Sequence, residues 1–343
     1  MQKRLRGSDP QLAVEVDLRC SQILETLPSC QWQDSPEFRW CMRIGIPARY
    51  RWHVWQKLLK VKSGTGQAEL VLQQDEWTQQ IEMDVGRTLA SEPSFTDRKR
   101  EQLQSLLKAY ARATPSIGYC QGMNFIGGII VLVCDDLLES LTAFKAVMEG
   151  PCQLAGFFAS GFPKLCQYVS ACDLLLQEEA PALRDHFLEE CILPATYLHQ
   201  WFLTLFAGTL PLPVVFGIWD RIIYEGLPFL LKQAVAMLLL LQQQLLKMNL
   251  EETMEYFRKL KSPPQQTLQY LGPMLIAQAD KVVVPEHILQ LLHTGALDED
   301  FEGNPLSKRS GESVGDPEDT AMSQGLGESI DGSESSDASF HIE

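Results

Sequence analysis

Apolar side chains recur at intervals of three and four residues along most of the 343-residue chain. The clearest case runs from Leu103 to Ala111, where apolar residues fall at i, i+3, i+4, i+7 and i+8. Thr96 offers a helix start before this segment, and Pro115 ends it. Alternating patterns bounded by hairpin turns are scarce, with one short β-like run at 281–285. The spacing therefore predicts an all-α chain.

Helix signals divide the chain into consecutive stretches. A capping Asp9 and first-turn Pro10 predict a helix start there. Further helices are expected at about 75–89, 96–115, 136–149, 171–188, 196–207, 212–225, 228–248 and 251–261, with an apolar helix after Gly122. Pro263-Pro264 ends the densest helical region, and a shorter apolar patch follows at 267–297.

The net charge of −15 belongs mainly to one end of the chain. Residues 298–343 carry 13 acidic and 2 basic side chains, which leaves −4 on residues 1–297. This segment is rich in Gly, Ser, Asp and Glu, so it cannot bury enough apolar surface to offset the entropy of ordering, and we expect it to be disordered. An acidic chain is also a poor candidate for binding nucleic acid through bulk electrostatics.

The nine cysteines are scattered, without a CxxC pair or any spacing typical of metal ligands. An odd number of cysteines in a chain without a signal peptide favours reduced thiols in the cytoplasm. The apolar run from Phe125 to Cys134 has 10 residues and is too short to cross a bilayer. We expect a cytoplasmic protein without a transmembrane segment.

The segment 81–88 places a carboxylate on an apolar helix face. Ile81, Asp84 and Val85 share that face, and a buried carboxylate needs a partner. Arg87 lies three residues beyond Asp84, within its reach, while Gly86 indicates a helix end or a close approach by another segment. On this octapeptide alone, Arg87 is most simply a solvated surface arginine.

The segment 115–125 places one amide side chain, Gln121, among small and flexible residues between two helices. Such a loop can present a polar group, although it can also be a plain connector. The neighbouring Cys120 raises the alternative of a thiol nucleophile, which would need a base and an orienting group. No cysteine-hydrolase signature surrounds the histidines of the chain, so this alternative is disfavoured.

A third segment begins with the turn Gly45-Ile46-Pro47. Arg51 and Trp55 follow at i and i+4, where a guanidinium can stack on an indole if the segment is helical. On its own this segment indicates an entry turn into a buried helix and carries little functional information.

Taken together and in order, these segments resemble the TBC domain, the family of GTPase-activating proteins for Rab-type small GTPases. The resemblance runs from about Arg43 to about residue 250 and rests on these motifs: Arg51-xxx-Trp55 after Gly-Ile-Pro, Ile81-xx-Asp84-xx-Arg87, Tyr119-x-Gln121-Gly122-Met123-Asn124, Trp201-Phe202-x-Thr204-Leu205-Phe206, Leu210-Pro211, Ile218-Trp219-Asp220 and Glu225-Gly226. It departs from the family pattern at Ile44 and at Leu89–Glu92 before Pro93, which affects loop geometry rather than the site side chains.

The resemblance implies an all-α fold of two helical subdomains, with this organisation: an N-terminal helical extension at 1–40, the TBC domain at 41–262, a C-terminal helical extension at 263–297 and the acidic tail at 298–343. It implies catalytic roles in trans for Arg87 as an arginine finger and Gln121 as a glutamine finger. It also implies supporting roles for Arg51, Trp55, Asp84, Tyr119 and Gly122. Trp55, Trp201, Phe206 and Trp219 are expected in the core.

The implied partner is a GTP-bound Rab-family GTPase in vesicle trafficking, which would bind GTP and Mg²⁺ itself and could recruit this chain to endomembranes. The chain would then have no active site for a free substrate and no cofactor of its own. Consistent with this, its sequence contains no GxxxxGK[ST] phosphate-binding loop. The alternative is a non-catalytic TBC protein that binds a Rab or acts as a scaffold.

Overall fold

The computed structural model describes residues 10–32, 34–61, 76–150 and 152–294, and these residues form helices and connecting turns without a strand. The prediction of an all-α fold is confirmed. Within the described ranges, no helix is both long and apolar enough to span a bilayer. The acidic segment 298–343, for which we expect disorder, lies outside the described residues.

The helices follow one another with short connections. In chain order they are α1 (Pro10–Thr26), η2 (Ser29–Gln31), α2 (Pro36–Ile44), α3 (Ala48–Leu58), α4 (Thr78–Arg87), α5 (Asp97–Ala113), α6 (Met123–Val133), α7 (Leu137–Glu149), η3 (Leu154–Phe157), α8 (Pro163–Glu179), α9 (Pro181–Glu189), α10 (Pro194–Leu203), α11 (Leu212–Glu225), α12 (Pro228–Leu245), α13 (Leu250–Lys259), α14 (Gln265–Ala279) and α15 (Glu286–Thr294).

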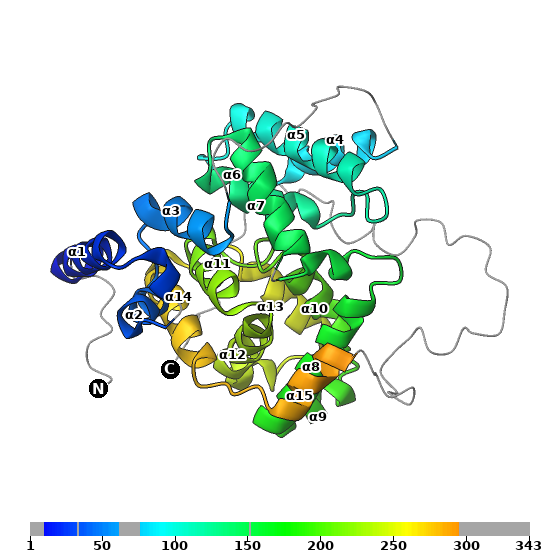
Figure 1. Cartoon of the computed structure of the whole chain (residues 1–343). Coiled ribbons are helices and arrows are strands. Elements are labelled where there is room, and N and C mark those ends of the chain that lie inside the picture. Colours follow the sequence, from blue (N-terminus) through cyan, green and yellow to red (C-terminus); the bar gives the residue numbers. More distant parts are fainter. Residues whose placement is uncertain (1–9, 33, 62–75, 151, 295–343) are drawn as a thin grey trace. The chain divides into compact units, whose positions relative to one another are not determined.

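The helices pack as two groups within one compact unit (Figure 1). The first group is α4–α7, in which α5 contacts each of the other three helices. In the second, α12 contacts α8, α10, α11 and α14. The short helix η3 touches α7 and α8, and α3 touches α6 and α11, so these elements join the groups.

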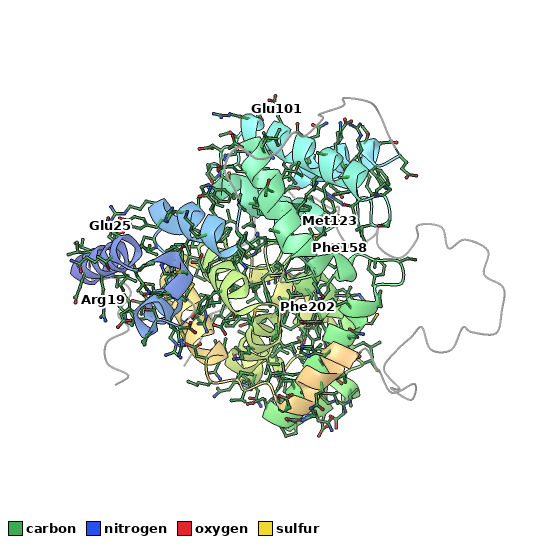
Figure 2. All side chains as sticks on the ribbon, in the orientation of Figure 1. Arg19, Glu25, Glu101, Met123, Phe158 and Phe202 are labelled. Atoms are coloured by element: carbon green, nitrogen blue, oxygen red, sulfur yellow. The ribbon has the colours of Figure 1, made fainter. Side chains whose placement is uncertain are left out.

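The side chains of the labelled residues divide into exposed and buried ones. Figure 2 shows Arg19, Glu25 and Glu101 at the periphery, whereas Met123, Phe158 and Phe202 point inward. Met123 begins α6 and is fully buried near the junction of the two groups. The expected core residues Trp55, Trp201, Phe206 and Trp219 are all buried.

Close packing of α6 fixes the position of the loop that precedes it. A Cβ atom on Gly127 would lie 2.6 Å from Leu103 Cδ1, so the Leu103 side chain of α5 packs directly against the backbone of α6. A Cβ atom on Gly128 would lie 3.2 Å from Thr88 Cγ2, just after α4. The apolar α6 is thus the shared support of α4 and α5.

Several predicted boundaries are wrong for identifiable reasons. The helix predicted at 171–188 is two helices, because Ala180 takes an extended φ of −148° before Pro181. The helix predicted at 196–207 ends at Leu203, and Leu205 and Phe206 then adopt positive φ. The β-like run at 281–285 is a connector between α14 and α15, in agreement with the all-α prediction.

Candidate functional site

Asp84 lies at the centre of a polar network at the end of α4. The apolar neighbours Ile81 and Val85 bury its helix face, as the periodicity predicts, and leave only 3% of the Asp84 side chain exposed. Asp84 Oδ1 accepts a hydrogen bond of 2.9 Å from Arg87 Nε and forms an ion pair with Arg87 Nη2 at 2.6 Å. Tyr119 Oη donates to Asp84 Oδ2 over 2.6 Å.

Arg87 combines a buried anchor with an exposed charge. Its side chain is 47% exposed, although its partner carboxylate is almost fully buried. Arg87 is the last residue of α4, so its guanidinium lies at the helix terminus where solvent or a partner can reach it. The expected pairing of Asp84 with Arg87 is therefore present, and it holds the guanidinium without burying it.

Tyr119 links this helix to the loop that carries Gln121. Burial raises the pKa of the Tyr119 phenol, and the hydrogen bond to Asp84 raises it further. The phenol therefore stays protonated at neutral pH and donates to the carboxylate. One carboxylate thus bonds both the Arg87 side chain and the segment two residues before Gln121.

A second chain of hydrogen bonds joins the same two segments. Thr88 Oγ1 donates to the Asp84 carbonyl over 2.6 Å, and Asn124 Nδ2 donates to Thr88 Oγ1 over 2.8 Å. The backbone N–H of Gly122 then donates to Asn124 Oδ1 over 2.9 Å. Thr88 and Asn124 are absent from the predicted site residues. A signal for Asn124 exists, since it is the one amide at the start of an apolar helix.

Two glycines shape the loop by conformation and by close approach. Gly118 has φ +65°, and a Cβ atom there would lie 2.6 Å from Trp77 Nε1. Gly122 has φ +108°, and a Cβ atom there would lie 3.0 Å from the Leu203 carbonyl oxygen. A side chain at either position would displace the loop, which gives Gly122 a structural basis for its predicted supporting role.

Gln121 lies between these two glycines, just before α6, and its side chain is half-buried. No hydrogen bond to another described residue restrains its amide. The network therefore fixes the backbone on both sides of Gln121 and leaves the side chain available.

Cys120 does not have the properties of a nucleophile. Burial raises the pKa of its thiol, and the nearby Asp84 carboxylate raises it further. Since the thiolate is the reactive form, both effects disfavour reaction at neutral pH.

Arg51 and Trp55 belong to a different cluster, centred on Asp220 of α11. Arg51 Nε donates to Asp220 Oδ1 over 3.1 Å, Trp55 Nε1 donates to the same oxygen over 2.7 Å, and the Ile46 N–H donates to Oδ2 over 3.2 Å. Burial raises the pKa of Asp220, and these partners oppose that effect. The cluster ties α3 and the turn before it to α11, with no hydrogen bond to Arg87 or Gln121 among the described residues.

Arg51 and Trp55 do not use the stacking that their i, i+4 spacing allows. The Arg51 guanidinium lies over Phe216, 4.8 Å from the ring centroid, and Trp55 stacks on Trp219 with centroids 5.6 Å apart. Hydrogen bonds to Asp220 hold both side chains against α11. The residue pattern along α3 alone does not predict these contacts, because they involve a helix far away in the sequence.

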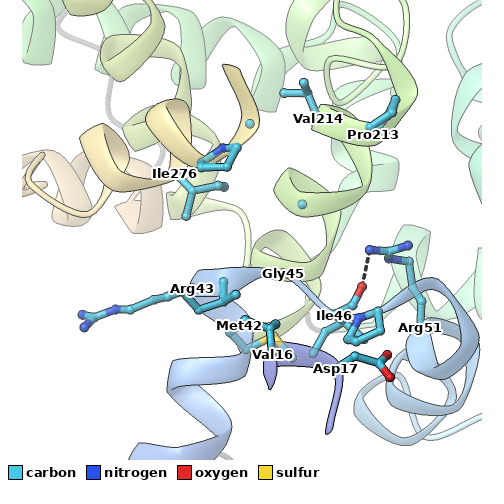
Figure 3. A pocket seen from close by; sticks show the side chains of 15 residues that line it. Val16, Asp17, Met42, Arg43, Gly45, Ile46, Arg51, Pro213, Val214 and Ile276 are labelled. Atoms are coloured by element: carbon cyan, nitrogen blue, oxygen red, sulfur yellow. Dashed lines mark hydrogen bonds between the residues drawn. The ribbon is translucent and has the colours of Figure 1, made fainter. Parts of the chain in front are cut away.

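A cavity of about 380 Å³ adjoins this second cluster (Figure 3). The Gly45–Pro47 turn, α1, α11 and α14 form its walls. Figure 3 shows Arg51 bonded to the Ile46 carbonyl at its edge. Arg87 and Gln121 do not line this cavity.

A scan against protein-family models matches residues 48–246, more than half of the chain, to the Rab-GTPase-TBC domain. The chain belongs to this family. The TBC match contains α4, the Gln121 loop, and Arg51, Trp55 and Asp220 of the second cluster.

Curated relatives agree with this assignment. GTPase-activating protein GYP5 of Saccharomyces cerevisiae is 31% identical over 215 residues, which are 62% of this chain and 24% of GYP5. Human TBC1 domain family member 14 is 31% identical over 182 residues, which are 52% of this chain and 26% of that protein. This TBC protein therefore matches about a quarter of the length of these relatives.

Solved structures share the fold at low identity. The Chlamydomonas flagellar RabGAP TBC domain superposes with a TM-score of 0.65 at 22% identity, covering 82% of this chain and 99% of that domain. The Ypt/Rab-GAP domain of Gyp1p gives a TM-score of 0.64 at 19% identity, covering 78% of this chain and 98% of that domain. The two-group helical arrangement is thus the TBC fold.

Proposed function

We propose that this TBC protein accelerates GTP hydrolysis by a Rab-family GTPase in its GTP-bound form, with Arg87 and Gln121 acting in trans. The observation that carries this proposal is the Asp84 network, which holds an exposed guanidinium and the Gln121 loop through one buried carboxylate. The names of the relatives, which include a GTPase-activating protein and a Ypt/Rab-GAP domain, support it.

Arg87 would stabilise the charge that develops on the transferred phosphoryl group. Its guanidinium stays protonated and presents a planar fork of donors that fits phosphate oxygens. Asp84 occupies Nε and Nη2, so Nη1 and the outward N–H groups remain for the partner. An arginine supplied in this way is worth about 10³–10⁵ in rate.

Gln121 would orient the attacking water. A primary amide can accept a hydrogen bond from water through its oxygen and donate to a phosphate oxygen through its nitrogen. Gln121 would take the place of the glutamine that many GTPases supply themselves. The nucleotide and Mg²⁺ belong to the partner, and this chain contributes side chains only.

A single-turnover screen tests the activity. GTP-loaded Rab proteins are mixed with the wild-type chain, with Arg87→Ala and with the exposed-arginine control Arg98→Ala. We expect the wild-type chain to accelerate hydrolysis by at least one Rab. Arg87→Ala should lose most of this acceleration, and Arg98→Ala should keep all of it. Acceleration of no Rab, or an unchanged rate in Arg87→Ala, would reject the proposal.

The same screen addresses the scaffold alternative. Stable binding to a GTP-loaded Rab without any change in hydrolysis would assign this chain to the non-catalytic class. Recruitment to endomembranes is part of the proposal only through the Rab, so the chain would follow its partner's location.

A further inference from the structure

A second cavity, of about 400 Å³, lies where α2, α11, α12 and the end of α14 meet. Four cationic side chains and two carboxylates line it: Arg39, Arg43, Arg221, Lys232, Glu225 and Asp280. Arg87 and Gln121 are not among its lining residues. The cavity therefore concentrates positive charge on an acidic chain, away from the proposed GTPase-activating residues.

The two carboxylates are already shared by two of the arginines. Asp280 pairs with Arg43 at 3.3 Å and with Arg221 at 2.5 Å, and Glu225 pairs with Arg221. Arg39 and Lys232 have no ion pair with any residue in the described ranges. The lining thus keeps a surplus of two positive charges that no described side chain neutralises.

Arg221, which lines the cavity, is a buried and permanently charged side chain. Its side chain is 5% exposed, and its Nη1 atom is buried without a hydrogen-bond partner among the described residues. Burial opposes the charge, but hydrogen bonds to Asp280 and Glu225 outweigh it and raise the pKa of Arg221.

The remaining cations come from two different helices, α2 and α12. Arg39 and Arg43 are four residues apart and share one face of α2, while Lys232 is half-buried near the start of α12. Figure 3 shows Arg43 extending away from the first cavity, consistent with its pairing to Asp280 at the second. The α2 helix is held there by contacts with α11 and α14.

We propose that this cavity binds a phosphate monoester group, carried either by a soluble polyol phosphate or by a phosphorylated lipid headgroup. Guanidinium groups match phosphate oxygens in geometry, and a phosphate monoester carries nearly two negative charges at neutral pH, which equals the unneutralised surplus. The volume lies within the range of small-molecule sites. The carboxylates of Glu225 and Asp280 would direct the phosphate toward Arg39 and Lys232.

Titration calorimetry of the full chain with inositol trisphosphate tests the site. The double variant Arg39→Gln/Lys232→Gln removes the two unpaired cations. The matched control Lys57→Gln/Lys247→Gln removes the same charge from two exposed lysines that do not line the cavity. We expect about 10- to 100-fold weaker binding in the cavity variant and little change in the control.

Vesicle flotation then distinguishes the two sources of phosphate. Binding to phosphatidylcholine vesicles that contain a phosphoinositide, but not to vesicles with equal charge from phosphatidylserine, would assign a lipid headgroup. Binding of inositol trisphosphate without vesicle binding would assign a soluble ligand. Absence of binding to both probes, or equal loss in both double variants, would overturn the proposal.

Discussion

At the scale of single residues, Asp84 holds two side chains, Arg87 through Oδ1 and Tyr119 through Oδ2. An arginine side chain loses about 2 kcal/mol of rotamer entropy when it is fully ordered, so in the proposed function the prior ordering of Arg87 would lower the cost of docking. The exposed position of Arg87 and the burial of Asp84 are thus parts of one arrangement, in which the buried carboxylate orders the exposed guanidinium.

Removing the Tyr119 hydroxyl isolates one half of this arrangement. Tyr119→Phe deletes the 2.6 Å hydrogen bond to Asp84 Oδ2 and leaves that buried oxygen without its donor. We expect the free energy of unfolding to fall by about 1–3 kcal/mol. Urea denaturation measures this loss. Because Asp84 still holds Arg87, GTP hydrolysis should fall by much less than in Arg87→Ala, and an equal fall would contradict the assigned roles.

Gly118 and Gly86 provide a matched pair of glycine substitutions near the site. Gly118→Ala places a Cβ atom 2.6 Å from the Trp77 indole nitrogen at φ +65°, so we expect a loss of about 1–3 kcal/mol in unfolding free energy. Gly86→Ala meets nothing within 4 Å in the last turn of α4 and should gain up to about 1 kcal/mol. Thermal unfolding of both variants decides this, and a gain in Gly118→Ala would contradict the packing described.

At the scale of elements, the end of α10 supports the Gln121 loop through its contact with Gly122. The turn that follows α10 is held in place by Lys261, whose amine donates to the carbonyls of Ala207 at 2.6 Å and Leu210 at 3.0 Å. Support for the glutamine loop therefore comes from a helix and a lysine more than 70 positions later in the chain.

Lys261 makes the free energy of unfolding depend on pH in the alkaline range. Burial lowers the pKa of Lys261 to about 8, against a weaker opposite effect of Glu92, whereas an unfolded lysine titrates near about 10.4. Between pH values of about 8 and 10.4 the unfolded chain holds more protons at Lys261 than the folded chain does. The contribution of Lys261 to the free energy of unfolding therefore increases as the pH rises through this range. Lys261→Met lacks this titration.

Denaturant unfolding from pH 7 to pH 10.5 measures the difference in unfolding free energy between the wild type and Lys261→Met. We expect wild type to be the more stable at pH 7, because the variant leaves two carbonyls without a donor. The difference should then increase above about pH 8. A constant or decreasing difference would contradict the assigned burial.

The sequence predicts most elements here but few of the contacts between them. Periodicity places α4, α5, α7 and α11–α13 within a few residues, because each helix buries one apolar face. It also places Asp84 on the buried face within reach of Arg87. It does not predict the pairing of Tyr119 with Asp84, which are 35 positions apart, or of Arg51 with Asp220, which are 169 apart. These pairs depend on how helices pack, and no local pattern encodes that packing.

At the scale of the whole molecule, the Asp220 cluster joins the beginning of the TBC match to its later half. Asp220→Ala would leave the buried Arg51 without its carboxylate, and we expect a loss of about 3–5 kcal/mol in unfolding free energy. Differential scanning calorimetry should show a lower melting temperature. The variant Arg51→Met/Asp220→Leu removes both charges and should recover the part of the loss that comes from the unpaired Arg51, while the buried Trp55 Nε1 and Ile46 N–H donors stay without an acceptor. No recovery at all would contradict the assignment of this cost to the unpaired charge.

The two polar clusters thus differ in what they do for the molecule. Asp220 and Arg51 hold helices together in the interior, and Asp84 and Tyr119 hold exposed groups at the surface. The distinction predicts that folded molecules of an Asp220 variant retain activity per molecule, while Arg87 and Gln121 variants fold normally and lose it.

The saturating single-turnover rate of GTP hydrolysis by a responsive Rab tests the central claim most directly. The rate is measured with the wild-type chain, Arg87→Ala and Gln121→Ala, together with the affinity of each for the GTP-loaded Rab. We predict a fall of about 10³–10⁵-fold for Arg87→Ala. For Gln121→Ala we predict about 10²–10³-fold, the usual cost of removing a side chain that hydrogen-bonds in the transition state. Either variant retaining the wild-type rate at saturation would contradict the account.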